Sequence, residues 1–87
     1  MMRRTKEFRG ISKRLAANYL ENLGGQRADP DGDRIEGDGW TADLSAETVR
    51  VAGSIELTEV TVVFEGSEPV LEELIEDFTR KAMRAGG

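Results

Sequence analysis

The sequence predicts an α+β domain in which an antiparallel sheet carries two helices packed on one face, in the order β-α-β(4)-α. Apolar residues recur at helical spacing over residues 12–23 and again over residues 67–84, which predicts the two helices. Over residues 34–64, apolar and polar residues alternate in short runs, as in strands that bury one face. A sheet covered on one face buries every apolar stripe, so we expect a single domain over residues 1–87.

The N-terminal residues are basic, and we expect residues 1–7 to form a flexible arm. A short strand is predicted over Thr5 to Arg9, and the first helix over Ser12 to Leu23. Ser12 is the expected N-cap of that helix, because its hydroxyl can accept a hydrogen bond from a free backbone N–H. Gly24-Gly25 is expected to end the helix, since glycine readily adopts the left-handed conformation of a C-cap.

Four strands are predicted after an acidic turn at residues 29–33. They cover Arg34 to Glu36, Gly39 to Leu44, Glu47 to Val51, and Ile55 to Phe64. Ser45-Ala46 is short enough for a hairpin turn, so the second and third strands are predicted to pair, with Val49 and Val51 facing the core.

The last of these runs changes phase along its length. Ile55 and Leu57 alternate on one face, whereas the later apolar residues, from Val60 onward, alternate on the other. We therefore expect a β-bulge near Thr58-Glu59. Three acidic side chains of this run are expected on the solvated face of the sheet: Glu56, Glu59 and Glu65.

The final helix has the clearest pattern in the chain. Ser67 is its expected cap and Pro69 lies in its first turn. Its apolar stripe consists of Val70, Leu71, Leu74, Ile75, Phe78 and Ala82. Acidic residues fill its first half and basic residues its second, which the helix dipole favours without any ligand. The helix is expected to end near Met83 or Arg84, leaving residues 85–87 as a flexible tail.

The composition excludes several function classes. The 87 residues include no cysteine and no histidine, so disulfides, thiolate chemistry and the commonest general base and metal ligand are absent. We expect a protein that is not an enzyme and needs no cofactor or metal. The chain is acidic, with a net charge of −5, and contains neither a membrane span nor a signal peptide, so cytoplasm is the expected location.

Two charged clusters and one aromatic residue are the candidate contact sites. Carboxylates crowd the turn region at Asp29, Asp31, Asp33, Glu36 and Asp38. They fail the EF-hand spacing and are expected to be solvated, although a loose attraction for cations stays open. Trp40 and the basic side chains of Arg9, Lys13 and Arg14 are the candidates for contact with a protein partner. Nucleic acid is disfavoured, because no aromatic residues interleave with the basic ones.

The chain ends in Gly86-Gly87, the tip that a ubiquitin-like modifier or sulfur carrier presents to its activating enzyme. In those proteins the diglycine follows a strand of a β-grasp fold with the order β-β-α-β-β. Here it follows the predicted final helix directly, so the end of a helix is the favoured interpretation and an activation tail the alternative.

Several stretches resemble one known family. E-F-R-G-I, then R-L-A-A-N-Y-L-E-N-L-G-G, a G-D-G-W strand and a final helix with T-R-K-A are similar to the C-terminal domain of MoaD-related proteins, standing alone here. The resemblance covers about Phe8 to Ala85, and Y-L-E-N-L-G-G at Tyr19 to Gly25 is its most specific part. It implies a TBP-like architecture and lends no active residue, since the resemblance does not extend to the sulfur-carrier domain that precedes this domain in the family.

Three functions remain open at this stage. The first is a non-catalytic accessory module that works with a separate sulfur carrier, a ubiquitin-like protein or its adenylating enzyme, in molybdenum-cofactor biosynthesis or related sulfur transfer. The second is a carrier activated at Gly86 and Gly87. The third is a small-ligand binder that uses a sheet–helix crevice near Trp40 and Phe78, as in helix-grip folds.

Overall fold

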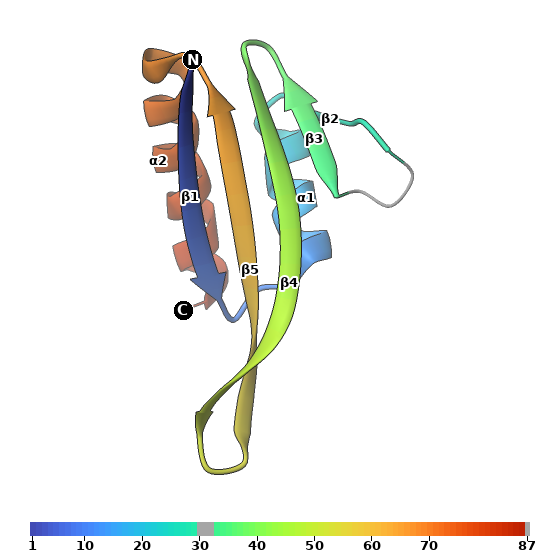
Figure 1. Cartoon of the computed structure of the whole chain (residues 1–87), viewed down its shortest axis with the longest axis vertical. Helices are drawn as coiled ribbons and strands as arrows, with labels where there is room; N and C mark the ends of the chain where they lie inside the picture. The colour runs from blue at the N-terminus through green and yellow to red at the C-terminus, as the bar shows by residue number, and fades with distance from the viewer. Residues whose placement is uncertain (30–32, 87) are drawn as a thin grey trace.

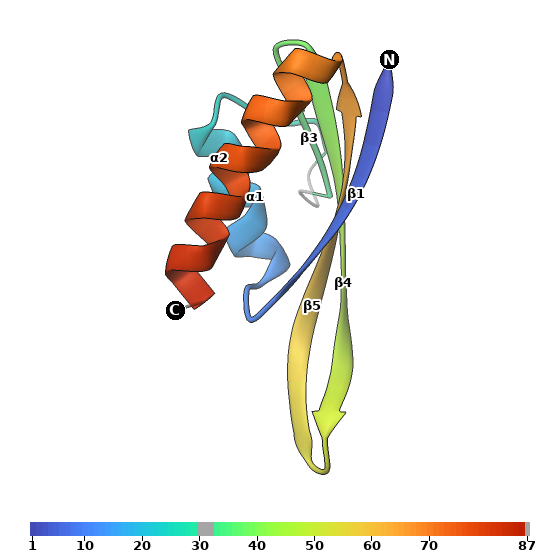
Figure 2. The ribbon, with the colours of Figure 1, turned by 90° about the vertical axis from the view of Figure 1, so that its left-hand side faces the viewer.

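The computed structural model describes residues 1–29 and 33–86. The elements are β1 (Met2–Arg9), α1 (Lys13–Asn22), β2 (Gln26–Arg27), β3 (Arg34–Gly37), β4 (Trp40–Ala52), β5 (Ile55–Gly66) and α2 (Glu68–Gly86). Within these ranges the strands form one antiparallel five-stranded sheet in the order β1-β5-β4-β3-β2. Both helices lie against the same face of the sheet, and the other face is open (Figures 1 and 2). The predicted α+β class is confirmed.

The number of strands between the helices agrees with the prediction, but their identities differ. β4 is one strand that includes Ser45 and Ala46, so the predicted hairpin at these residues is wrong. They pair with Thr61 and Val60 of β5, because β5 is long enough to continue the ladder past them. The chain turns instead after β4, where Gly53 has a φ of 52°. The short strand β2 has no recognisable apolar pattern and was not predicted.

The phase change in residues 55–64 has a different cause from the predicted bulge. β5 pairs regularly through Thr58 and Glu59, and the irregularity lies in β4 between Arg50 and Ala52. Ile55 and Leu57 are exposed, by 57% and 38%, so they never join the core.

The prediction that Val49 and Val51 face the core is also wrong. Val49 is half-buried and Val51 is 41% exposed. Both belong to the end of the β4–β5 hairpin, which projects beyond the helices (Figure 2). The 13 residues of β4 span about 43 Å at roughly 3.3 Å per residue. The 10 residues of α1 span only about 15 Å, so this helix cannot cover the whole ribbon.

The N-terminal residues lie in the sheet. β1 pairs with β5 from Met2 opposite Gly66 to Arg9 opposite Glu59, so the expected flexible arm is wrong for residues 2–7. Alternation places Phe8 toward the helices, where it is half-buried, and pairing with β1 satisfies the outer edge of β5. Pairing with β5 keeps residues 2–7 extended. The sequence shows little sign of this strand, because Phe8 is its only large apolar side chain after Met2.

The helix ends follow the sequence closely. Ser12 caps α1, since its hydroxyl accepts a hydrogen bond of 3.0 Å from the N–H of Leu15, and Gly24 follows the helix with a φ of 103°. α2 continues to Gly86, past its predicted end, and Gly87 lies outside the described residues.

The core lies between the sheet and the two helices and is centred on Phe78. This side chain is fully buried. Its ring meets those of Phe8, Tyr19 and Phe64 edge-to-face, with centroid separations of 4.9, 6.0 and 5.8 Å. Through Phe78, α2 therefore contacts the edge strand β1, the neighbouring strand β5 and the other helix.

Candidate binding surface around Trp40

Trp40 opens β4 at the edge of the helix-covered layer and is 7% exposed. Its ring occupies space that side chains at neighbouring glycines would need. A Cβ added at Gly37 would lie 2.1 Å from Cε2 of the indole, and one added at Gly25 would lie 2.7 Å from its Cη2. The end of β3 and the segment after α1 therefore both pack their backbone against the indole.

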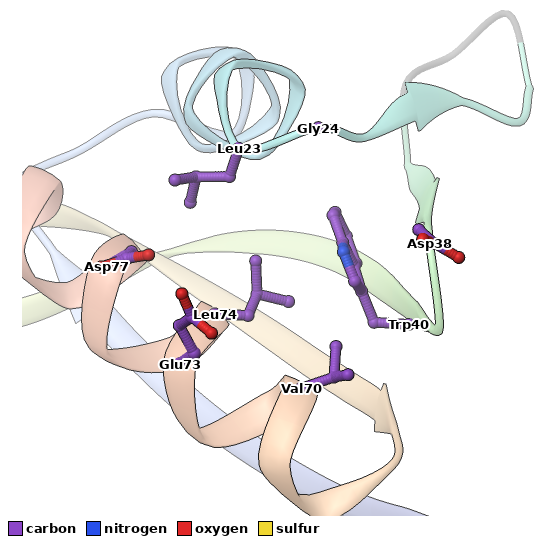
Figure 3. Close-up of a pocket in the computed structure, with 8 residues that line it drawn as sticks. All are labelled: Leu23, Gly24, Asp38, Trp40, Val70, Glu73, Leu74 and Asp77. Carbon is purple, nitrogen blue, oxygen red and sulfur yellow. The ribbon is translucent and has the colours of Figure 1, made fainter.

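A cleft of about 240 Å³ lies beside this ring. Its lining residues are Leu23, Gly24, Asp38, Trp40, Val70, Glu73, Leu74 and Asp77. Figure 3 shows the side chains of Leu23, from the end of α1, and of Val70 and Leu74, from α2, directed toward the same space as the indole. Acidic groups stand around this apolar floor, with Glu73 and Asp77 on the α2 side and Asp38 at the outer edge.

The cleft suits a cation on an apolar stem. Its volume lies below the roughly 300–1,000 Å³ of typical small-molecule sites, so one side chain of a partner fits it better than a cofactor does. Trp40 offers an aromatic surface to such a cation. Asp77 is 3.6 Å from Arg80, whereas no ion pair of Glu73 occurs in residues 1–29 and 33–86, so of these two the carboxylate of Glu73 is the one available to an incoming group.

The structure does not bring the four predicted contact residues together. Arg9 pairs with Glu59 in the middle part of β5, whereas Trp40 pairs with Gly66 at the end of that strand. These seven steps along the strand correspond to about 23 Å. Lys13 forms an ion pair with Asp33, and Arg14 is exposed on α1. Trp40 and the three basic residues are therefore separate surface features.

Sequence reasoning found Trp40 and missed the rest of the cleft. Leu23, Val70 and Leu74 read as ordinary core positions of their helices, and Glu73 as a solvated residue. Only the packing of α2 against the end of α1 and the start of β4 brings these side chains around one space. The acidic residues in the first half of α2 were the feature of the sequence that could have pointed to the acidic side of this cleft.

Glu59 lies on the open face of the sheet, as predicted, but it is buried there instead of solvated. It is 7% exposed, and Nε of Arg9 donates a hydrogen bond of 2.9 Å to its Oε2. This hydrogen bond lowers the pKa of Glu59 below its ordinary value. A hydrogen bond to Glu59, together with the charge of Glu59, raises the pKa of Glu7. One guanidinium thus holds a pair of carboxyl groups on the open face of the sheet.

Replacing Arg9 by alanine is expected to destabilise the protein more at neutral pH than in acid. A depressed carboxyl pKa stabilises the fold above the ordinary pKa of the unfolded chain, and this stabilisation is lost as the pH falls through the depressed value. The raised pKa of Glu7 has the opposite effect. It stabilises the fold in acid, and this stabilisation is lost as the pH rises through the raised pKa. Without Arg9 the largest cause of the depressed pKa of Glu59 is lost.

The measurement is the change in Tm caused by Arg9→Ala at pH 7 and at about pH 2. Arg14→Ala is the control, because Arg14 is exposed and forms no ion pair with any described residue. An equal loss of Tm at both pH values would contradict the role given to Arg9.

The acidic turn contributes internal contacts. Oδ1 of Asp29 accepts a hydrogen bond of 3.1 Å from the N–H of Asp33, and Glu36 is 3.6 Å from Arg34. Asp31 lies outside the described residues. Among residues 1–29 and 33–86, no group of three or more side chains is placed to hold a metal ion. The attraction of this turn for cations stays a prediction.

Comparison with known families shows to which protein family the chain belongs. Residues 4–87, nearly the whole chain, match the model of a family described as archaeal MoaD-like protein. The chain belongs to this family. A search of curated proteins finds no significant match.

Membership in the archaeal MoaD-like family confirms the resemblance found in the sequence and associates the chain with sulfur-carrier and molybdopterin pathways. The TBP-like architecture stays a prediction. In the described ranges, no helix is both long and apolar enough to cross a membrane.

Proposed function

We propose that this archaeal MoaD-like protein is a non-catalytic accessory module that binds a separately encoded sulfur carrier, or its adenylating enzyme, in molybdenum-cofactor biosynthesis or related sulfur transfer. The observation that carries this proposal is the end of α2. The helix continues through Gly86, so the first residue of the diglycine belongs to a helix and not to an extended tail. The order β1-α1-β2-β3-β4-β5-α2 also differs from that of a β-grasp carrier.

The sequence and the cleft support binding as the activity. A chain without histidine or cysteine lacks the usual nucleophile activators and neutral-pH general base. The cleft beside Trp40 combines an apolar floor with acidic groups and has room for one cationic side chain. A partner that presents lysine or arginine on its surface would match this chemistry.

A titration followed by NMR tests the proposal. Adding the sulfur carrier, and separately its adenylating enzyme, to the ¹⁵N-labelled protein is expected to shift the indole N–H signal of Trp40 with at least one of them. Glu73→Lys is expected to weaken that binding about tenfold, because it places a cation where the partner's cation would bind. Glu72→Lys is the matched control, since it makes the same charge change on the side of α2 that faces β1.

The competing function is activation of this chain at its own C-terminus. It would require the last turn of α2 to unwind, because a helix cannot enter the narrow channel of an activating enzyme. Incubation with ATP and the adenylating enzyme would then change the mass of this chain, and deletion of Gly86 and Gly87 would abolish the change. That result would overturn the accessory role, as would the absence of shifts with both proteins at about 1 mM.

The third function, small-ligand binding deep between sheet and helices, has less support. Phe78 is fully buried among three other aromatic rings, which occupy the space where a helix-grip ligand would lie.

A further inference from the structure

The projecting end of the β4–β5 hairpin has a free backbone edge. β3 pairs with β4 only from Trp40 to Asp43, and the next N–H, that of Leu44, donates to the carbonyl of Asp33 at 2.6 Å. Beyond that point, among the described residues, β4 from Ser45 to Ala52 has a neighbouring strand on one side only, which is β5. Figure 1 shows this ribbon extending past the rest of the sheet.

Two hydrogen bonds reveal which backbone groups point outward. Leu44 directs its N–H away from β5, toward Asp33. The carbonyl of Thr58 accepts a hydrogen bond of 3.1 Å from the N–H of Gly10, and so points away from Thr48, its partner in β4. Because these directions alternate along an antiparallel strand, Ala46, Thr48 and Arg50 present their N–H and C=O groups to the free edge.

The same ribbon exposes apolar side chains on the open face of the sheet. Val60 and Val62 are buried under the helices, so residues of odd number in this part of β5 point to the opposite face. Leu57 is one of them, and it pairs directly with Val49 of β4. An exposed edge that also carries apolar side chains is a surface that favours strand pairing.

We propose that this edge pairs with the same edge of a second copy of the chain, antiparallel, around a two-fold axis at Val49. Val49 then lies opposite Val49 of the second copy, and Thr48 lies opposite Arg50 of that copy. The open face gains an apolar strip across four strands, formed by Leu57 and Val49 of each copy. The proposal does not depend on the accessory function.

Other two-fold axes along β4 are less favourable than the axis at Val49, because of like charges or of existing hydrogen bonds. An axis at Glu47 would place two glutamates directly opposite each other, and an axis at Arg50 would do the same with two arginines; both are unfavourable. An axis at Thr48 would bring Ala52 of the second copy opposite Leu44, whose N–H is already bonded to Asp33. An axis at Val49 ends the pairing at Ala46, just short of that contact.

The net charge of the chain adds a condition to the pairing. Each copy carries −5, so the two copies repel one another at a distance. Salt screens this repulsion over about 8 Å at physiological ionic strength. Dimerisation is therefore expected to strengthen as salt is added, whereas pairing driven by opposite charges would weaken.

Sedimentation of the full chain and of two lysine variants, together with cross-linking of two cysteine variants, tests the proposal. Val49→Lys is expected to weaken dimerisation at least about tenfold, because it opposes two cations at the axis. Val51→Lys makes the same change away from the axis, at the irregularity of β4, so dimerisation is retained. In the cysteine-free chain, Val49→Cys is expected to cross-link readily on mild oxidation, since non-hydrogen-bonded partners lie about 4.5 Å apart.

Thr48→Cys is the control for cross-linking, because the two Thr48 positions are offset along the strands in this register. A monomer at about 1 mM protein in high salt would overturn the proposal. So would a dimer that Val49→Lys leaves intact, or one in which Thr48→Cys cross-links and Val49→Cys does not. These outcomes are read without any sulfur carrier, so they are independent of the test of the accessory function.

Discussion

Replacing Phe78 by alanine is expected to lower the free energy of unfolding by about 3–5 kcal/mol. The side chain is fully buried, and its ring contacts those of Phe8, Tyr19 and Phe64. Removing it leaves a cavity where α2, β1, β5 and α1 meet, so no single element can shift to close it. Proteins of this size have a stability of about 5–15 kcal/mol, so much of the folded population would be lost.

Urea unfolding followed by circular dichroism measures this loss. Met83→Ala is the matched control on the same helix, because Met83 is 72% exposed and its truncation removes few contacts. A loss below about 1 kcal/mol for Phe78→Ala would mean that the aromatic cluster does not hold the helices to the sheet.

The second large effect is expected at Gly37. A Cβ there would lie 2.1 Å from Cε2 and 2.3 Å from Nε1 of Trp40, much closer than side-chain atoms approach one another. Either the indole or the end of β3 must move, and such overpacking costs about 1–3 kcal/mol. We expect Gly37→Ala to be destabilised by this amount and to shift the fluorescence of its single tryptophan to longer wavelength as the indole becomes hydrated.

Gly53→Asn provides the comparison for this variant. Gly53 lies in the hairpin turn between β4 and β5, where a Cβ meets nothing within 4 Å, and asparagine tolerates its φ of 52°. Its fluorescence should match that of the parent chain. If Gly37→Ala also leaves the emission unchanged, the indole does not depend on the glycine, and the cleft beside it is more tolerant than the contacts indicate.

Elements with strong local signals were predicted well. α1 begins after the cap Ser12 and ends before Gly24, and α2 carries the apolar stripe that includes Phe78. In both cases the periodicity and the capping residues lie within the element itself, so no knowledge of its neighbours is required.

Elements that depend on a neighbouring strand were predicted poorly. Ser45-Ala46 was interpreted as a turn, although its pairing with β5 keeps it extended. Residues 2–7 were interpreted as an arm, although they complete the edge of the sheet. Pairing energy comes from the partner strand, and a partner many residues away leaves no local trace in the sequence.

The candidate site was predicted only through its aromatic residue. Trp40 was singled out, but the cleft beside it depends on Leu23 and on Val70, Glu73 and Leu74, which come from two other segments. Arg9, Lys13 and Arg14 were grouped with Trp40 because all were chemically suited to a partner. The register of β5 places Arg9 and Trp40 seven residues apart along that strand, opposite Glu59 and Gly66.

The amino-acid sequence by itself determined the two helices, the alternation that makes a one-sided sheet, and the absence of histidine and cysteine chemistry. These properties are local or compositional, so they need no spatial information. Only the tertiary structure showed that β4 is one long strand and that the β4–β5 hairpin extends beyond the helices (Figure 2). It also revealed the cleft with acidic groups beside Trp40. Each of these depends on which distant segments touch, because strand pairing and helix packing are set by the whole chain at once.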